Sequence, residues 1–144
     1  MSILVVDANV LISAAVFGGT PRRFLVDLPI SVRLVIPAST AEEARSRLRS
    51  RYARKFAGRG PLPELAERLE TIIGGFDIVE PTLALSVSRD PDDDRLLALA
   101  VEVGATAVVT GDKDLLVLTP FRGLRILTPA EAWRDFCQAL HVTG

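Results

Sequence analysis

The sequence predicts an α/β fold in which about five parallel strands carry helices on both faces, a three-layer α/β/α sandwich. Short apolar runs rich in β-branched residues, without polar alternation, are typical of parallel strands covered on both sides. Helical patterns separate these runs, and strands that alternate with helices imply right-handed crossovers. The chain has 144 residues, 49% of them hydrophobic, which is enough for a buried core. We therefore expect a single domain over residues 1–144.

The strands and helices follow in order along the chain. The predicted strands are Ile3–Val6, Leu34–Ile36, Ala107–Val109 and Leu124–Leu127, with a weaker fifth at Asp77–Val79. The predicted helices are Asn9–Val16, Pro21–Leu28, Ser39–Phe56, Pro63–Ile73, Asp90–Val103, a short one from Asp112, and Pro129–Leu140. The helix from Asp90 has the clearest ends, because Pro91 suits a first turn and Gly104 follows its last residue.

The composition excludes several classes of chemistry. Cys137 is the only cysteine and His141 the only histidine, so a disulfide framework and a zinc site built from cysteines are ruled out. A lone histidine near the C-terminus also argues against a Ser/His/Asp or Cys/His triad. The formal net charge of −1 identifies no partner. No signal pattern or membrane span is present in the sequence, so we expect a soluble cytoplasmic protein without a membrane partner.

Acidic and polar residues gather where the predicted strands end. Ligands of open α/β sheets bind beyond the carboxyl ends of the strands, so these residues are candidates for a site. They are Asp7 and Asn9 after the first strand, Glu42 and Glu43 in the long helix, the run Asp90, Asp92, Asp93 and Asp94, and Thr110, Asp112 and Asp114 after the fourth strand.

Each acid also has a structural interpretation. Asp90 is a natural N-cap with Asp93 at N3, and Ser39 with Glu42 matches a capping box. Asp112 lies in a sequence typical of turns. Asp7 fits this interpretation less well, since a carboxylate at the end of a buried strand is costly unless it is paired or bound to a metal.

Together, the acids indicate metal chemistry. Carboxylates that converge without histidine or cysteine form a site of hard oxygen ligands, suited to Mg²⁺ or Mn²⁺. Such an ion relieves the repulsion between them and can activate water against a phosphodiester. This chemistry needs no protein nucleophile, which agrees with the scarcity of histidine and cysteine.

A run of basic residues suggests the substrate. Seven basic residues without an intervening acid lie between positions 45 and 59, where a solvated helix face usually mixes both signs. Arginine suits bidentate contact with phosphate. Tyr52 and Phe56 could stack on bases, but core contacts are the simpler role. The basic residues are Arg45, Arg47, Arg49, Arg51, Arg54, Lys55 and Arg59.

Four motifs, in this order and spacing, resemble those of PIN domains, the ribonuclease fold shared by VapC-like toxins of toxin–antitoxin systems. They are LVVDANVLISA, EEARSRL, DPDDDRLLALA and AVVTGDKDLL. The resemblance runs from Ile3 to about Trp133 and implies a metal-dependent endoribonuclease with strand order 3-2-1-4-5. That order would place Asp7 beside Asp112. It also implies a cognate antitoxin that covers the acidic cleft, and members of the family often form homodimers.

The resemblance assigns catalysis and metal binding to Asp7, Glu43, Asp93 and Asp112, with Asn9, Thr110, Asp90 and Asp114 in support. Arg47 departs from the family pattern, which has an apolar residue there, and this leaves Glu42 as a substitute for Glu43. Asp90, Asp92 and Asp94 leave the choice of Asp93 open in the same way. The RNA-binding residues would be Arg45, Arg47, Arg49, Arg51, Arg54 and Lys55.

Two other functions are compatible with the sequence. A phosphatase similar to haloacid dehalogenases also begins with a strand that ends in Asp, but its general acid/base would stand where this chain has Asn9. A PIN-like module that binds RNA or protein without catalysis is the other alternative, because a fold does not by itself imply activity.

Overall fold

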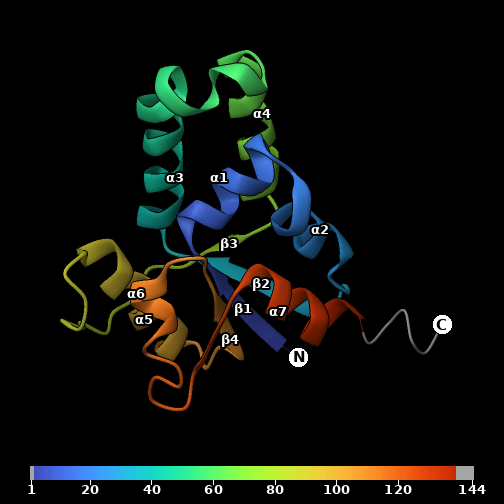
Figure 1. The fold of residues 1–144 in the computed structure, drawn as a ribbon. Coiled ribbons are helices and arrows are strands. Elements are labelled where there is room, and N and C mark those ends of the chain that lie inside the picture. The colour runs from blue at the N-terminus through green and yellow to red at the C-terminus, as the bar shows by residue number, and fades with distance from the viewer. Residues whose placement is uncertain (1, 139–144) are drawn as a thin grey trace.

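A computed structural model describes residues 2–138 (Figure 1). Five parallel strands form one sheet in the order β3-β2-β1-β4-β5, which confirms the predicted fold class and strand order. Central β1 pairs with β2 on one side and with β4 on the other. His141 and Leu140, the predicted end of the last helix, lie outside the described residues. The strands are β1 (Ser2–Val6), β2 (Val32–Ile36), β3 (Asp77–Ile78), β4 (Ala107–Val109) and β5 (Arg125–Leu127).

Consecutive residues of the central strands face two different cores. Leu4 and Val6 of β1 belong to one hydrophobic cluster, and Val5 belongs to the other. Val108 of β4 likewise faces away from its two neighbours. Because side chains alternate across a strand, a sheet covered on both faces needs an apolar residue at every position. This explains why residues 4–6 of β1 and Ala107–Val109 of β4 are uninterrupted apolar runs.

The helices form an unequal pair of layers. The larger layer contains α1 (Ala8–Val16), α2 (Gly19–Asp27), α3 (Ala38–Arg51), α4 (Leu62–Ile73) and α7 (Pro129–Trp133). The smaller layer contains α5 (Pro91–Glu102) and α6 (Lys113–Leu116). Between residues 2 and 138, no helix is long and apolar enough to span a membrane.

The long helix predicted over Ser39–Phe56 is only partly regular. The α-helical part, α3, ends at Arg51, and a π-helical segment, Tyr52–Phe56, and a 3₁₀ turn, Ala57–Arg59, follow it. A further π-helical segment, Arg134–Gln138, extends α7. Phe56 is buried, and the Tyr52 hydroxyl donates a hydrogen bond to the Gly60 carbonyl at 2.8 Å. The core role of these two aromatic residues is confirmed.

The predicted capping box of Ser39 and Glu42 is wrong. The N-cap of α3 is Pro37, with φ −72° and ψ 156°, and no side chain caps the helix. Proline fixes the backbone close to the geometry that an N-cap needs, so the helix begins before Ser39 and places this residue inside the first turn. The capping interpretation of Asp90 holds, since its side chain accepts a hydrogen bond from the Asp92 amide.

Candidate metal centre

Asp7 and Asp112 meet at the carboxyl edge of the sheet through Thr110. The Thr110 hydroxyl donates to Asp7 Oδ2 at 2.7 Å and accepts from the Asp112 amide at 3.0 Å. Asp7 follows β1 and Asp112 follows β4, and these strands are direct neighbours. Asp7 is 4% exposed and Thr110 is fully buried. The adjacent strands therefore bring the two acids together, as the strand order implied by the resemblance requires.

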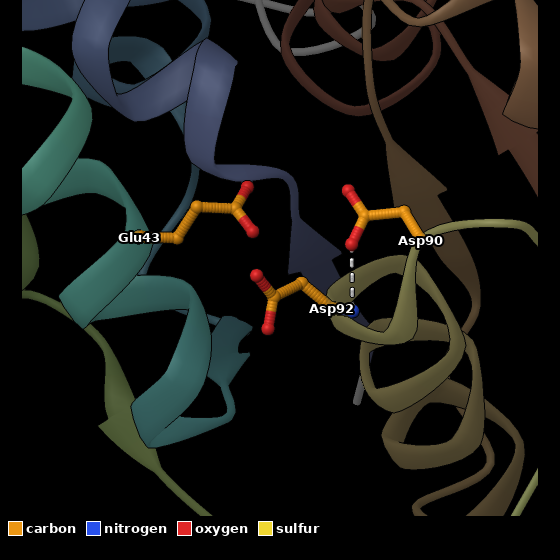
Figure 2. A group of neighbouring side chains, drawn as sticks. All are labelled: Glu43, Asp90 and Asp92. Carbon is orange, nitrogen blue, oxygen red and sulfur yellow. Dashed lines mark hydrogen bonds between the residues drawn. The ribbon is translucent and has the colours of Figure 1, made fainter.

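The four acids at the start of α5 differ in their contacts. Asp90 caps the helix, and Asp92 turns toward α3 (Figure 2). Asp93 is buried, with the Ser88 hydroxyl directed at its Oδ2. Asp94 accepts the amides of Val87 and Ser88 at 2.9 and 2.7 Å and so holds the preceding loop. Asp94 therefore has a structural role, whereas the other three acids face the site.

Glu43 from α3 closes the site from the opposite side. Glu43, Asp90 and Asp92 each offer a carboxylate oxygen within 4.8 Å of the others, and among residues 2–138 no other group of three or more possible ligands is this close. Figure 2 shows their side chains directed toward one another from α3 and from the start of α5. Of the four predicted ligands, only Glu43 belongs to this tight group. Its other members are Asp90, which was predicted to support the site, and Asp92, which was one alternative to Asp93. Glu42 instead pairs with Arg45.

Arg47 lies within this acidic region. One of its nitrogens, Nη1, is 2.9 Å from Glu43 Oε1 and donates to Asn9 Oδ1 at 3.1 Å. Nη2 lies 3.8 Å from Asp90 Oδ2. The guanidinium thus touches α1, α3 and the start of α5. Sequence reasoning grouped Arg47 with the RNA-binding residues, and its departure from an apolar pattern was the signal for a different position.

The ionisation of the acids reflects burial and crowding. Burial, followed by contact with Asp92, raises the pKa of Glu43 to about 8, against the opposing charge of Arg47. Burial and the charges of Asp7, Asp90 and Asp112 raise the pKa of Asp93 to about 7. Burial also raises the pKa of Asp7, although the hydrogen bond from Thr110 opposes it. The charges of Asp7 and Asp112 thus add to the effect of burial on the pKa of Asp93.

An open cleft of about 400 Å³ adjoins the acids. Asp90, Asp93, Asp112 and Asp114 line it, and so does a loop that sequence reasoning missed. Ser88 of this loop contacts Asp93, and the exposed Arg89 supplies positive charge at the cleft. No sequence motif marked the loop, because its position depends on Asp94 and not on a pattern of its own.

The residues fit a hard divalent ion. Glu43 Oε2 is buried and has no hydrogen-bond partner in the described chain. A buried carboxylate oxygen is rarely left without a partner, and every candidate ligand around it is an oxygen atom. Mg²⁺ and Mn²⁺ prefer such ligands. The chemistry of the donor set therefore matches the predicted ions.

The basic residues between positions 45 and 59 form two groups, those that contact other side chains of the chain and those without an ion pair among the described residues. Arg45 pairs with Glu42 and Glu70, Arg47 lies among the acids, and Arg59 stacks on Phe17 at 4.6 Å. The remaining residues form no ion pair with any described residue, and all but the half-buried Arg51 are exposed. They lie on the end of α3 farther from the sheet and on the segment after it (Figure 1). These are Arg49, Arg51, Arg54 and Lys55.

Comparison with known proteins identifies the family. The family model described as PIN domain matches residues 3–114, a range that contains all four predicted ligands. The chain belongs to the PIN domain family. This PIN domain is 32% identical over 122 residues to the uncharacterized protein MJ1680 of Methanocaldococcus jannaschii, covering 80% of this chain and 74% of that protein.

A solved structure agrees on the fold. The PIN domain superimposes with a TM-score of 0.60 on a chain from the crystal structure of VapBC2 of Rickettsia felis bound to a DNA fragment from its promoter. The match covers 88% of this chain and 98% of the other, at 13% sequence identity. At that identity the likeness concerns the fold.

Proposed function

We propose that this PIN domain is a metal-dependent endoribonuclease and the toxin component of a toxin–antitoxin system. The observation that carries the proposal is the buried, unpartnered Oε2 of Glu43, a residue that offers a carboxylate oxygen within 4.8 Å of oxygens of Asp90 and Asp92. A bound Mg²⁺ or Mn²⁺ would stabilise negative charge on a phosphodiester and lower the pKa of an attacking water.

The chain's residues hold and orient this site. Asp7, Glu43, Asp93 and Asp112 are the proposed metal ligands, direct or through water, because Mg²⁺ usually keeps several waters. Thr110 fixes the carboxylate of Asp7 and the backbone of Asp112. Asp90 and Asp92 add negative charge beside Glu43, and Asp114 lines the exposed end of the cleft.

The free basic residues would bind the RNA backbone. The exposed Arg49, Arg54 and Lys55 form no ion pair within residues 2–138, so no intramolecular acid competes with phosphate for them. From Arg47 to the end of α3 at Arg51 the helix rises about 6 Å, at 1.5 Å per residue, and Arg54 and Lys55 follow on the next segment. RNA bound along α3 would therefore lead into the acidic edge.

An antitoxin is the proposed protein partner. This fold is similar to that of a chain in the crystal structure of VapBC2, which was solved with VapBC2 bound to a DNA fragment from its promoter. In this PIN domain, a basic side chain from an antitoxin would find its complement in the acidic cleft. The proposed location is the cytoplasm, and the homodimers that members of the family often form are a second association to test.

RNA cleavage tests the activity. The purified chain should cleave a mixed RNA pool with Mn²⁺ and lose this activity with EDTA. Asp7→Asn should be inactive, whereas Asp77→Asn, an exposed aspartate on edge strand β3 paired with Arg33, should cleave like wild type. Equal, EDTA-insensitive activity of wild type and Asp7→Asn would contradict the proposal.

The non-catalytic module is the alternative outcome. A calorimetric titration that shows no Mn²⁺ binding to wild type, and no change in Asp112→Asn, would favour it. The phosphatase alternative has little support, because Asn9 stands at the general acid/base position and its Oδ1 accepts a hydrogen bond from Arg47.

A further inference from the structure

We propose that Arg47 is a tethered cation that competes with the divalent ion for Glu43. This chain would then bind the ion more weakly than the same carboxylates would with an apolar residue at position 47. The inference rests on the proposed function in one respect, since it assumes that the ion binds at this edge of the sheet.

The contacts of Arg47 are those of a cation inside a ligand cluster. Its guanidinium reaches Glu43 of α3, Asn9 of α1 and Asp90 at the start of α5. Two of these three partners belong to the tight carboxylate group. Its positive charge also opposes the rise that burial causes in the pKa of Asp7, Glu43 and Asp93. One side chain therefore neutralises acids on both sides of the site.

The helix directs Arg47 toward the site instead of solvent. Residues four apart share a helix face, so Arg47 and Glu43 point the same way. The Arg47 side chain is 25% exposed and that of Glu43 is 8% exposed, whereas Arg49, two residues further on, is exposed. Burial reduces solvent screening and strengthens the interaction of Arg47 with the acids.

This position has opposite effects with and without the ion. In the absence of metal, the guanidinium stabilises crowded carboxylates that would otherwise repel one another. Once an ion approaches, Arg47 occupies Glu43 Oε1 and leaves only Oε2 without a partner. The ion must then displace the guanidinium or bind beside a like charge.

Thermal unfolding and calorimetry with Mn²⁺ distinguish competition between Arg47 and the ion from a role of Arg47 in packing alone. Arg47→Val should unfold at a lower temperature than wild type in EDTA but show a larger rise in Tm on adding Mn²⁺. It should also bind Mn²⁺ at least about tenfold more tightly, equivalent to about 1.4 kcal/mol. Arg49→Val makes the same change in charge on the same helix without touching the cluster, and should match wild type in both measurements.

The outcomes distinguish this inference from the proposed function. An equal Mn²⁺-induced rise in Tm and equal affinity in Arg47→Val and wild type would overturn the role of Arg47 alone. Binding in neither protein would overturn both proposals. Binding only in Arg47→Val would support the tethered cation and contradict the metal-dependent activity of wild type. Should Arg47→Val fail to fold in EDTA, Arg47→Gln, which keeps a donor for Asn9, serves for the same comparison.

Discussion

At the carboxyl edge of the sheet, Asp7 and Asp93 are buried and are held by hydrogen bonds from Thr110 and Ser88. Beyond the far end of α3, in contrast, Arg54 and Lys55 are exposed and pair with no acid in the described part of the chain. The two regions carry opposite charge, and the fold restrains only one of them.

The difference indicates two kinds of function. Burying carboxylates costs free energy and raises their pKa, so a fold that gathers them keeps them ionised only with a compensating cation. Exposed arginines cost little and keep full access to a partner, which suits contact with a phosphate backbone without regard to sequence. The acidic edge should therefore determine chemistry, and the basic run should determine affinity.

The largest difference in RNA cleavage is expected between variants of two buried neighbours on α5, Asp93 and Asp94. Asp93→Asn removes a proposed ligand, and RNA cleavage should fall by about 100-fold or more, since even outer partners of a metal site contribute 10–100-fold. Asp94→Asn affects an acid that holds backbone amides, so it should lower stability while leaving Mn²⁺ affinity within about twofold. Single-turnover cleavage and Mn²⁺ calorimetry on both variants check this. Equal loss of Mn²⁺ affinity in the two variants would contradict the assignment.

A smaller loss is expected at Thr110. Thr110→Val keeps the shape but removes the hydroxyl that joins Asp7 to Asp112, so cleavage should fall by about 10-fold, the lower end for such partners. Thr110→Ser restores a hydroxyl and should recover most of the activity. Because a purely structural role would not change metal binding, the Mn²⁺ dissociation constant should also rise in Thr110→Val and recover in Thr110→Ser. A valine variant with wild-type Mn²⁺ affinity would contradict a positioning role.

The basic run should affect RNA binding without affecting the metal. In the Arg54→Ala/Lys55→Ala double variant, two phosphate contacts are lost, so the slope of log affinity against log salt should decrease in magnitude by about 1.4. Fluorescence anisotropy with a single-stranded RNA over a salt series measures this slope. Arg33→Ala/Arg125→Ala makes the same charge change at ion-paired positions and should leave the slope unchanged. An equal decrease in both double variants would show that only net charge matters.

The smallest effect concerns pH and stability without metal. The pKa values of about 8 for Glu43 and about 7 for Asp93 lie above the unfolded values of 4.5 and 3.8. The folded protein therefore retains protons that the unfolded chain has lost, and the free energy of unfolding falls as pH rises through this window. In EDTA, Tm should decrease between pH 5 and 8, and less so in Glu43→Gln. Differential scanning calorimetry tests this, and identical pH profiles of the two proteins would contradict it.

Much of this organisation was predictable because strong local rules agreed with the fold. The strands of the sheet interior are buried on both faces, so their sequences carry an unambiguous signal. The resemblance to PIN domains implied that β1 and β4 are neighbours, and acids that follow neighbouring parallel strands lie at the same edge, so it implied that Asp7 and Asp112 lie together. Pro91 and Gly104 placed the ends of α5 to within one or two residues.

Other features depend on side-chain direction, which sequence spacing does not give. Ser39 matched a cap pattern, but Pro37 already began the helix. The run from Asp90 to Asp94 contains similar residues whose tasks differ because successive positions on a helix face different ways. Arg47 lay in a basic run, and only the packing of α3 against α5 shows that it points into the acids.

The location of Mn²⁺ tests the central claim most directly. Crystals grown with Mn²⁺, measured at a wavelength where manganese scatters anomalously, should show a peak at the carboxyl edge of the sheet. Oxygens of Asp7, Glu43, Asp93 or Asp112 should lie at bonding distance from it or one water away. A peak confined to other surface acids, or none in crystals of a protein that cleaves RNA, would contradict the account.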